Sequence, residues 1–390
     1  MDEILSKNIH EMPGMSFDCS CGKTHSVDIK NIIINSNILE NILVTVSAFK
    51  DKKVFLFSDN NTYIIYGSKV HELLINNSFN VKNFIFDKGK VQLIPDERAL
   101  GRLVMEMEID TSLIIAVGSG TLNDLARILS SRTNIPYIII GTAPSMDGYA
   151  SVISPLIIEG FKKTFPGVYA NSIIGDVEIM KQAPMNMILA GFGDILGKMT
   201  ALADWKLSKE INNEYYCQTC VTMVQNAIDK CVNNIDGIVR RDETSIKYLM
   251  EGLVYSGIAM GLAKDSRPAS GAEHILAHYW EIDALSKGQE HALHGNAVGV
   301  GTVIISLIYN IIGDRLPVKV NVVNPEEVIT LLKRVGAKYS PASLGITREL
   351  FRESILEGWK IRPRYTILRF AQQMGLLEEL ADKLDKYFYN

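Results

Sequence analysis

Four short runs of apolar residues, each bounded by polar residues or glycine, lie between Lys53 and Ile140. They predict buried strands at 53–59, 81–86, 112–117 and 135–140. The segments between them carry apolar residues at helical spacing and predict helices at 67–77, 96–108 and 122–131. Because strands alternate with helices, we predict a parallel, doubly wound sheet. The segment at 31–50 fits neither period clearly.

From Asn186 onward, long segments with helical spacing follow one another, without a strand-like run of comparable strength. Glycine and proline interrupt them near 236–242, 265–271, 313–317, 341–345 and 358–363. We therefore predict fold class α/β, with a doubly wound parallel-sheet domain and small N-terminal appendage at 1–184 and an all-helical domain at 185–390. The most apolar window, 298–313, includes polar residues and predicts a buried helix instead of a membrane span.

Composition and charge narrow the function classes. The chain has 390 residues, 47% hydrophobic and 22% charged, which is typical of a soluble globular enzyme with two domains. A net charge of −4 without a basic run argues against nucleic acid as a partner. The first ten residues, MDEILSKNIH, lack the apolar core of a secretory signal. We expect a cytoplasmic protein without membrane attachment.

Four of the seven histidines fall between residues 266 and 294. His274 and His278 are one helical turn apart, and His291 and His294 follow a polar, glycine-containing break at 286–289. Two imidazoles from the first pair and one from the second can converge on a metal such as zinc, nickel or iron. The alternative is a pair of half-buried histidines satisfied by hydrogen bonds.

A carboxylate is needed to balance the charge of such a metal. The best candidate is Asp194 in Gly191-Phe192-Gly193-Asp194, where we expect the glycines to form a turn ahead of an apolar helix. A zinc protease is excluded, because that motif needs glutamate directly after the first histidine and Ile275 stands there.

Two loops follow predicted strands and offer groups for a cofactor. Gly118-Ser119-Gly120 begins the helix at 122–131, where backbone N–H groups and the helix dipole can meet a phosphate. Asn123 stands where the third glycine of the dinucleotide fingerprint belongs, so the motif alone is weak. The alternative is a capping box formed by Thr121 and Asp124, and both can hold at once.

The second loop, 141–151, follows the strand at 135–140, and open α/β sheets bind ligands at the carboxyl ends of their strands. Its small polar side chains are Thr142, Ser145, Asp147 and Ser151; an ordinary polar turn is the alternative. Asp59 ends an earlier strand and either accepts a ribose hydroxyl or forms a turn before Asn60.

The five cysteines do not indicate a disulfide framework. Cys217 and Cys220 lie in a stretch predicted to be helical, 214–231, which argues against a thioredoxin-type redox pair. Cys19, Cys21 and His25 offer three ligands for a small structural zinc site. Because a fourth ligand is not evident, a hairpin turn with incidental thiols is the favoured interpretation.

Several of these motifs together carry a resemblance. The blocks GSGTLND, TAPSMDGYAS, GFGDILGK, SRPASGAEHILAH and LHGNAVG resemble the bacterial type of sn-glycerol-1-phosphate dehydrogenase. That family belongs with the glycerol dehydrogenases, iron-type alcohol dehydrogenases and dehydroquinate synthases. The resemblance covers most of the chain, and SRPASGAEH is its most specific block. It implies that 1–184 binds a dinucleotide and that 185–390 binds metal and substrate.

The resemblance also implies roles for individual residues. The metal ligands are Asp194, His274 and His294, and the catalytic residues that contact substrate are Asp147, Asp194 and His278. The residues implied for cofactor binding are Asp59, Gly118, Gly120, Thr121, Leu122, Asn123, Asp124, Thr142, Ala143, Pro144, Ser145 and Ser151. Asp59 matches less securely than the others, and His291 receives no role.

The implied reaction is NAD(P)H-linked reduction of dihydroxyacetone phosphate to sn-glycerol 1-phosphate, a precursor of phosphoglycerolipids. A divalent metal polarises the carbonyl, reduced nicotinamide delivers hydride, and the proton comes through His278 or bound water. Arg267 and Lys264 are candidate cations for the substrate phosphate. Nickel or zinc is expected ahead of iron, the choice between NAD and NADP stays open, and relatives indicate a homodimer.

Three other functions stay open from the sequence. A glycerol dehydrogenase acts on a polyol without phosphate, so a phosphate-binding cation separates it from the first interpretation. A lyase similar to dehydroquinate synthase uses NAD only transiently, but its histidine block is missing here. A binding or regulatory protein with an inactive site is disfavoured, because the complete Asp/His/His set is present.

Overall fold

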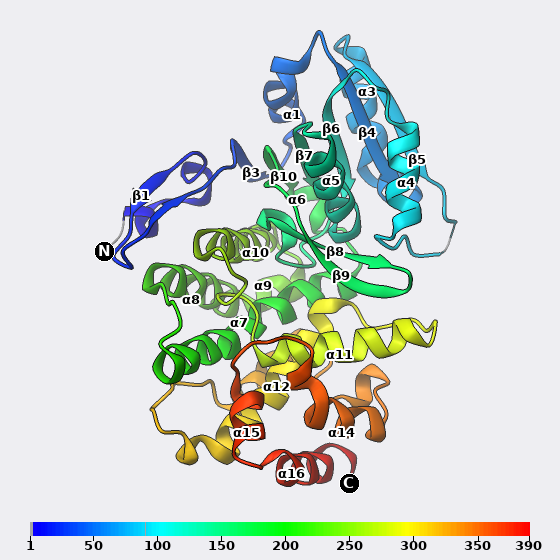
Figure 1. The fold of residues 1–390 in the computed structure, drawn as a ribbon. Coiled ribbons are helices and arrows are strands. Elements are labelled where there is room, and N and C mark those ends of the chain that lie inside the picture. Colours follow the sequence, from blue (N-terminus) through cyan, green and yellow to red (C-terminus); the bar gives the residue numbers. More distant parts are fainter. Residues whose placement is uncertain (1–2, 90) are drawn as a thin grey trace.

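The computed structural model describes residues 3–89 and 91–390, and a six-stranded sheet forms the core of its N-terminal half (Figure 1). All neighbouring strands in this sheet are parallel. Their order is β3 (Asn31–Asn35), β10 (Ser172–Asp176), β7 (Tyr137–Gly141), β6 (Thr111–Gly118), β4 (Lys53–Asp59) and β5 (Asn80–Phe86). The four strands predicted from apolar runs are therefore confirmed, and the unassigned segment supplies β3 and α1.

Side chains that alternate along the strands pack on opposite faces of this sheet. Leu113 and Ile115 of β6 join one apolar cluster with the helices α1 (Leu39–Val46) and α3 (Ser68–Asn76). Ile114 and Ala116 join the other cluster with α4 (Glu97–Glu106) and α5 (Gly120–Thr133). Both faces are buried, which explains why the strands read as continuous apolar runs. The prediction of a doubly wound sheet is confirmed.

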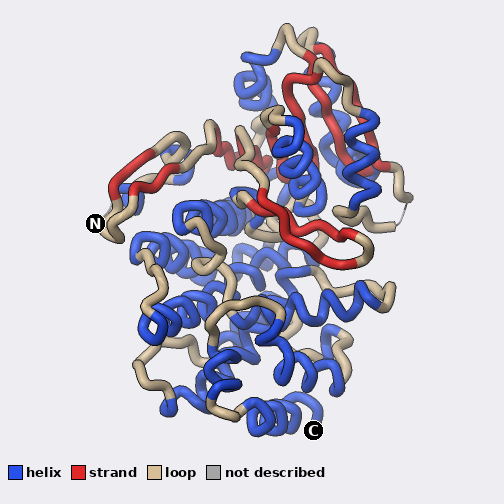
Figure 2. Tube along the Cα trace, viewed as in Figure 1, coloured by secondary structure: helices blue, strands red, loops and turns tan. Residues whose placement is uncertain are grey.

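The C-terminal half is built from helices in the region that follows β10 (Figure 2). The short helices α2 (Asn60–Thr62) and α6 (Val177–Met180) belong to the sheet region. The helical half comprises α7 (Met185–Asn212), α8 (Gln218–Asn233), α9 (Ile235–Arg240), α10 (Glu243–Ala263), α11 (Ala272–Ser286), α12 (His294–Ile312), α13 (Pro325–Val335), α14 (Arg348–Glu357), α15 (Ile367–Gln373) and α16 (Leu377–Tyr389). We propose the domain division at 184/185, where α7 begins. The expected break at 236–242 is wrong in part, because α9 fills most of it.

One helix, at His294–Arg315, is long and apolar enough to cross a membrane by length and composition. Most of its apolar window is buried inside the protein, at 83%. It includes α12, which packs against α7 and α11, so this segment is a core helix, as the interrupted apolar pattern predicts.

The glycine turn expected before Asp194 is wrong, because Gly191, Gly193 and Asp194 all lie inside α7. These glycines serve close packing instead. A Cβ atom on Gly191 would meet the Pro144 carbonyl oxygen at 1.8 Å, and one on Gly193 would meet the Gly295 carbonyl oxygen at 2.3 Å. The two glycines therefore bring α7 against the loop after β7 and against the start of α12.

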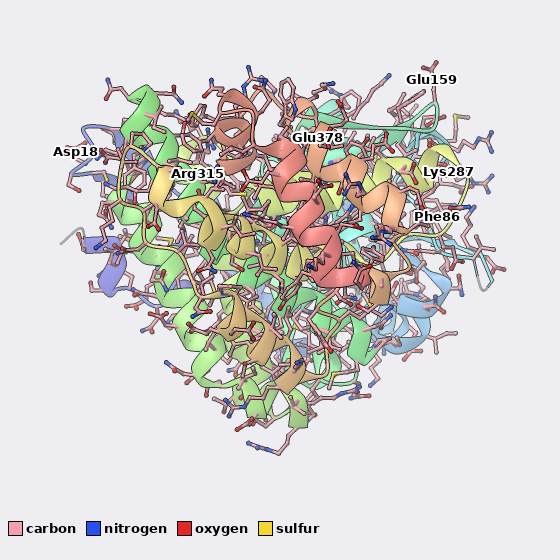
Figure 3. The ribbon with its side chains drawn as sticks, turned by 90° about the horizontal axis from the view of Figure 1, so that it is seen from below. Asp18, Phe86, Glu159, Lys287, Arg315 and Glu378 are labelled. Carbon is pink, nitrogen blue, oxygen red and sulfur yellow. The ribbon has the colours of Figure 1, made fainter. Side chains whose placement is uncertain are left out.

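Two small hairpins complete the described part of the fold. The hairpin turn favoured for residues 19–25 is confirmed as one of them, and the other was not predicted. β8 (Ile153–Ile158) and β9 (Phe161–Pro166) pair antiparallel and contact α5 and α11. Seen from the end that carries α16, Glu159 of their turn lies on the same side of the molecule as Lys287 at the end of α11 (Figure 3). β1 (Ser16–Asp18) and β2 (Thr24–Ser26) form the second hairpin, outside the main sheet.

Candidate functional site

A cleft of ≈ 300 Å³ is lined by both halves of the chain. The α/β half contributes the start of α5, the loop after β7 and the β8–β9 hairpin, and the helical half contributes α11, the start of α12 and the segment before α15. Residues of its wall include Ser119, Gly120, Thr121, Asp124, Ser145, Asp147, Ser151, Lys162, Ser270, His274, His278, Glu281, His291, His294 and Arg362. Most of the residues singled out in the sequence therefore meet in one cleft.

Three helices bring a carboxylate and two imidazoles together at this cleft. Asp194 of α7, His274 of α11 and His294 at the start of α12 offer ligand atoms that all lie within 4.8 Å of one another. His274 Nε2 lies 3.5 Å from Asp194 Oδ1, and the His274 and His294 ring centroids are 5.2 Å apart. The structure thus places side by side the three residues that the resemblance implies as metal ligands.

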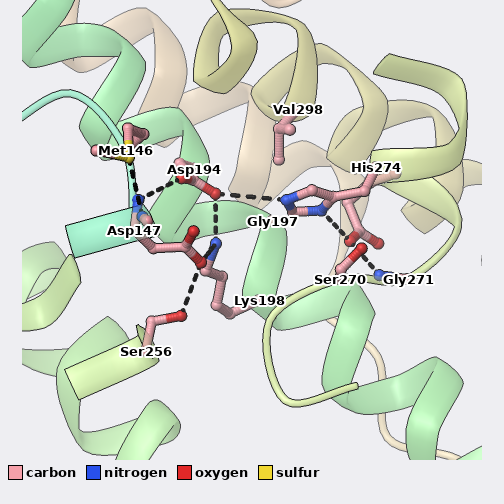
Figure 4. Close-up of polar contacts among 12 residues, drawn as sticks. Met146, Asp147, Asp194, Gly197, Lys198, Ser256, Ser270, Gly271, His274 and Val298 are labelled. Atoms are coloured by element: carbon pink, nitrogen blue, oxygen red, sulfur yellow. Dashed lines mark hydrogen bonds and ion pairs between the residues drawn. The ribbon is translucent and has the colours of Figure 1, made fainter. Parts of the chain in front are cut away.

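Asp194 belongs to a buried charge network (Figure 4). Its carboxylate accepts a hydrogen bond from the backbone N–H of Asp147 (3.0 Å) and pairs with the Lys198 ammonium. The same ammonium lies 2.8 Å from Asp147 Oδ2, which also accepts a hydrogen bond from the Ser256 hydroxyl (3.0 Å). Lys198 is fully buried and joins two carboxylates of the cleft, a role that the sequence did not reveal.

The protonation states of these groups suit a cation. Burial raises the pKa of Asp194, but the Lys198 ammonium and the His274 imidazole outweigh it, and the net pKa is lowered. Burial, followed by the charge of His274, lowers the pKa of His294 to about 3. An ionised carboxylate and a neutral imidazole are the forms that bind metal.

His274 is held from its far side by Glu273, a residue that the sequence reasoning missed. The Glu273 carboxylate lies 2.7 Å from His274 Nδ1 and also accepts hydrogen bonds from Thr200 (2.8 Å) and the Gly271 N–H (2.6 Å). Burial lowers the pKa of His274, while hydrogen bonds to Asp194 and Glu273 raise it above its ordinary value. Carboxylates in this position orient metal-binding histidines and leave Nε2 for the ion.

His278 faces the same cleft between two cations. Lys162 Nζ, from β9, lies 3.4 Å from its Nδ1, and Arg362 Nη2 lies 3.2 Å from its Nε2. Burial and then the Lys162 charge lower its pKa well below the ordinary value. His278, Glu281 and His294 form a second possible metal group. We favour the Asp194 group, because a divalent cation at the second would stand beside two positive charges.

The two cations expected to bind the substrate phosphate lie outside the cleft wall. Arg267 is buried and occupied by Glu214 at Nε (2.7 Å) and by the Tyr365 carbonyl (2.8 Å). Lys264 is exposed at the end of α10. The cleft wall instead contains the cations Lys162 and Arg362. Sequence reasoning missed both cations, because Arg362 and Lys162 lie 84 and 116 residues from His278 and carry no local motif.

The glycine turn leads into α5, and the capping box of Thr121 and Asp124 considered from the sequence is not formed. The helix begins at Gly120, and Ser119 at its N-cap makes no side-chain cap hydrogen bond. A Cβ on Gly118 would meet Leu122 Cδ1 at 2.1 Å, so any larger residue would displace the Leu122 side chain where the strand meets the helix. Asp124 turns to Arg127 (2.7 Å) instead of capping the helix. The first turn therefore faces the cleft with its backbone.

The remaining residues implied for cofactor binding fall into two groups. Thr121, Ser145 and Ser151 line the cleft with Gly120 and Asp124. Six others are buried and do not line the cleft: Gly118, Leu122, Asn123, Thr142, Ala143 and Pro144. Asp59 also lies outside it, because its carboxylate caps α2 through the Thr62 N–H (2.8 Å).

The donor set fits a divalent metal. One carboxylate oxygen and two imidazole nitrogens match the three protein ligands of catalytic zinc sites, which leave a further position for water or substrate. Among residues 3–89 and 91–390, His294 Nδ1 is one of the buried polar atoms without a hydrogen-bond partner. This ring nitrogen is therefore left without a protein partner and could bind a metal ion.

Similarity to known proteins agrees with this architecture. Residues 33–184 match the family described as iron-containing alcohol dehydrogenase. The fold is similar to glycerol dehydrogenase from Schizosaccharomyces pombe (TM-score 0.70, 17% identity, 91% of this chain and 90% of that one). It is also similar to maleylacetate reductase from Rhizobium sp. (TM-score 0.68, 14% identity, 92% and 97%). The chain is thus similar in fold, and over residues 33–184 in sequence, to the iron-containing alcohol dehydrogenases.

Sequence relatives narrow the class. The chain is 34% identical to the glycerol-1-phosphate dehydrogenase [NAD(P)+] of Bacillus licheniformis over 94% of both chains. It is 30% identical to the enzyme of that name from Methanosarcina barkeri, over 90% of this chain and 94% of the other. The chain belongs to the glycerol-1-phosphate dehydrogenase family, as the sequence blocks predict.

Proposed function

We propose that this chain reduces dihydroxyacetone phosphate to sn-glycerol 1-phosphate with NADH or NADPH. It is an NAD(P)-dependent oxidoreductase by its family. The observation that carries the proposal is the cleft that combines the Asp194, His274 and His294 ligand set with the cationic groups of Lys162 and Arg362 beside His278. The Lys162 ammonium is also paired with Glu281. A substrate with a carbonyl and a phosphate has a partner for each group there.

The protein's own groups prepare the cleft for this reaction. Asp194, His274 and His294 would hold the metal, which when bound supplies Lewis-acid polarisation of the substrate carbonyl. The first turn of α5 and Ser145 and Ser151 would hold the dinucleotide, the source of hydride. Asp147, fixed by Lys198 and Ser256, presents a carboxylate that can accept a substrate hydroxyl.

The assay that tests this proposal follows NADH or NADPH oxidation with dihydroxyacetone phosphate. Metal-stripped protein is compared with protein that has regained nickel, zinc or iron, and the product is resolved by chirality. We expect activity to return with a divalent metal and the product to be sn-glycerol 1-phosphate. Turnover of glycerol or dihydroxyacetone at equal efficiency would instead favour a glycerol dehydrogenase.

Arg362 and Lys162 are the groups we propose for the substrate phosphate. Arg362→Leu is expected to raise KM for dihydroxyacetone phosphate ~10–10²-fold, because a charge-assisted hydrogen bond contributes about 1.5–3 kcal/mol. The reduction of unphosphorylated dihydroxyacetone should be little changed. Lys264→Gln is the matched control, since that cation is exposed and outside the cleft lining. An equal loss with both substrates would contradict a phosphate role.

His278 is proposed to orient substrate and to pass on a proton. Its lowered pKa keeps the ring neutral, so it can donate one N–H to substrate while Lys162 stands at Nδ1 as a proton source. His278→Ala should keep the bound metal and lower kcat ~10²-fold. His291→Ala should behave nearly as wild type, because His291 is exposed. Metal loss from His278→Ala, measured by elemental analysis, would reverse the assignment.

Several finer properties remain proposals. We propose nickel or zinc as the native metal, since both accept mixed imidazole and carboxylate ligands. We propose a homodimer and a role in supplying phosphoglycerolipid synthesis from the family resemblance, and a cytoplasmic location from the sequence of the first ten residues. Asp59 caps α2, so it gives no argument on the choice between NAD and NADP.

A further inference from the structure

The β1–β2 hairpin and the start of α8 bring together four possible metal ligands that do not line the cleft. Cys19, Cys21 and His25 lie in or beside the hairpin, and Cys217 is the residue just before α8. Their ligand atoms all lie within 4.8 Å of one another. Cys217 is the fourth ligand that the sequence does not reveal, because almost 200 residues separate it from the other three.

Three of the distances between ligand atoms in this cluster are close to those of a tetrahedral zinc site. Zn–S bonds of about 2.3 Å and Zn–N bonds of about 2.0 Å place neighbouring ligand atoms ~3.5–3.8 Å apart. The Cys19 and Cys217 sulfurs are 3.6 Å apart, and His25 Nε2 lies 3.3 Å from the Cys21 sulfur and 3.6 Å from the Cys217 sulfur. The 3.6 Å between sulfurs is much longer than a disulfide bond of about 2.05 Å.

Groups around the sulfurs are arranged as they are around metal-bound thiolates. The Tyr215 hydroxyl lies 3.2 Å from the Cys21 sulfur, and the Thr219 hydroxyl lies 3.3 Å from that of Cys19. The backbone N–H of Cys21 also points to the Cys19 sulfur (3.5 Å). Donors of this kind orient thiolate ligands and offset their negative charge.

The turn that carries the ligands is shaped by Gly22. Its φ is +83°, and its N–H donates to the Cys19 carbonyl (2.9 Å), so the chain reverses between Cys21 and His25. Lys23 extends from this turn over the Tyr215 ring, 3.3 Å from the centroid. His25 and Cys217 are buried, which closes the cluster from the protein side.

We propose that Cys19, Cys21, His25 and Cys217 bind one structural zinc ion. Four protein ligands fill a tetrahedral shell, so the site has no open position for substrate and differs from the cleft site. Strands of three residues form a marginal hairpin on their own. The zinc therefore fastens this hairpin to α8 and the helical half. Cys220 is not among the four ligands, so on this proposal Cys217 serves as a zinc ligand and not as one half of a CxxC redox pair.

The test measures metal content of the full-length protein by elemental analysis, together with cobalt substitution. Wild type should bind two metals per chain. His274→Ala should retain one zinc, and after exchange with Co²⁺ it should show a thiolate-to-cobalt charge-transfer band, which the oxygen and nitrogen ligands of the cleft cannot produce. Because this arm leaves the hairpin unaltered, it does not depend on whether a cysteine variant folds.

Cys21→Ser should lose the zinc and the cobalt–thiolate band, keep the cleft metal and dihydroxyacetone phosphate reduction at low temperature, and unfold at a lower Tm. Cys231→Ser is the control. This cysteine lies in α8 but outside the cluster, so the variant should keep both metals. A His274→Ala protein with no zinc and no thiolate band would overturn the proposal. So would thiol titration that finds Cys19 and Cys217 joined as a disulfide.

Discussion

Replacing His274 with alanine is expected to remove the cleft metal and to lower kcat/KM at least ~10³-fold, since Lewis-acid stabilisation contributes several kcal/mol. The three-residue ligand set loses one member, and Asp194 keeps its pairing with Lys198 and its hydrogen bond from the Asp147 N–H. Alanine is the best helix former, so α11 should persist. Metal content, activity and far-UV circular dichroism of the variant provide the measurements.

Two comparisons make this result specific. Asp194→Asn should match His274→Ala in metal loss, because each removes one ligand of the same set. His278→Ala should keep its metal, although its ring lies only 6.3 Å from that of His274. Full activity in a His274→Ala protein shown to lack the cleft metal would end the metal hypothesis.

Lys198→Met is expected to destabilise the metal-free protein by about 3–5 kcal/mol, because it leaves a buried charge without its partner. Asp194 and Lys198 are both fully buried, and the ammonium also serves Asp147. Methionine keeps the length of the side chain, so lost charge dominates over lost packing. Chemical denaturation of wild type and variant without metal gives the difference in unfolding free energy.

The same helix supplies the matched control. Lys206 and Glu210 are also four residues apart on α7, at 2.7 Å, but their side chains are 38% and 34% exposed. Lys206→Met should change stability by less than ~1 kcal/mol, as surface pairs do. Added metal should stabilise Lys198→Met more than wild type, because the cation replaces the ammonium at Asp194. Equal metal-free stabilities of Lys198→Met and Lys206→Met would contradict this account.

Local patterns predicted the parts of the fold that depend on neighbours in sequence. The apolar runs at 53–59 and 112–117 mark β4 and β6, since both faces of a parallel sheet are buried. The β8–β9 hairpin escaped this reasoning. β9 has mostly exposed or half-buried residues, so its sequence carries no apolar run to mark a strand.

The residues of the candidate site also fall into two groups, those that the sequence predicted and those that only the structure revealed. His274 and His278 were recognisable because helical spacing places them on one face, and family blocks implied Asp194 and His294. Lys198 and Glu273 were not recognised as site residues, although Lys198 lies four residues after Asp194 and Glu273 directly precedes His274. A buried lysine and an exposed one have the same local sequence appearance, and burial is decided by what packs against the helix.

The sequence by itself determined the doubly wound sheet, the helical half and the residue types of the cleft, because periodicity and motif spacing are local properties of a chain. Tertiary structure alone decided that Arg362 and Lys162, not Arg267 and Lys264, face His278. It alone brought Cys217 to Cys19, Cys21 and His25. These contacts depend on how helices and hairpins pack in three dimensions, and no local pattern records a partner that lies 84 or more residues away.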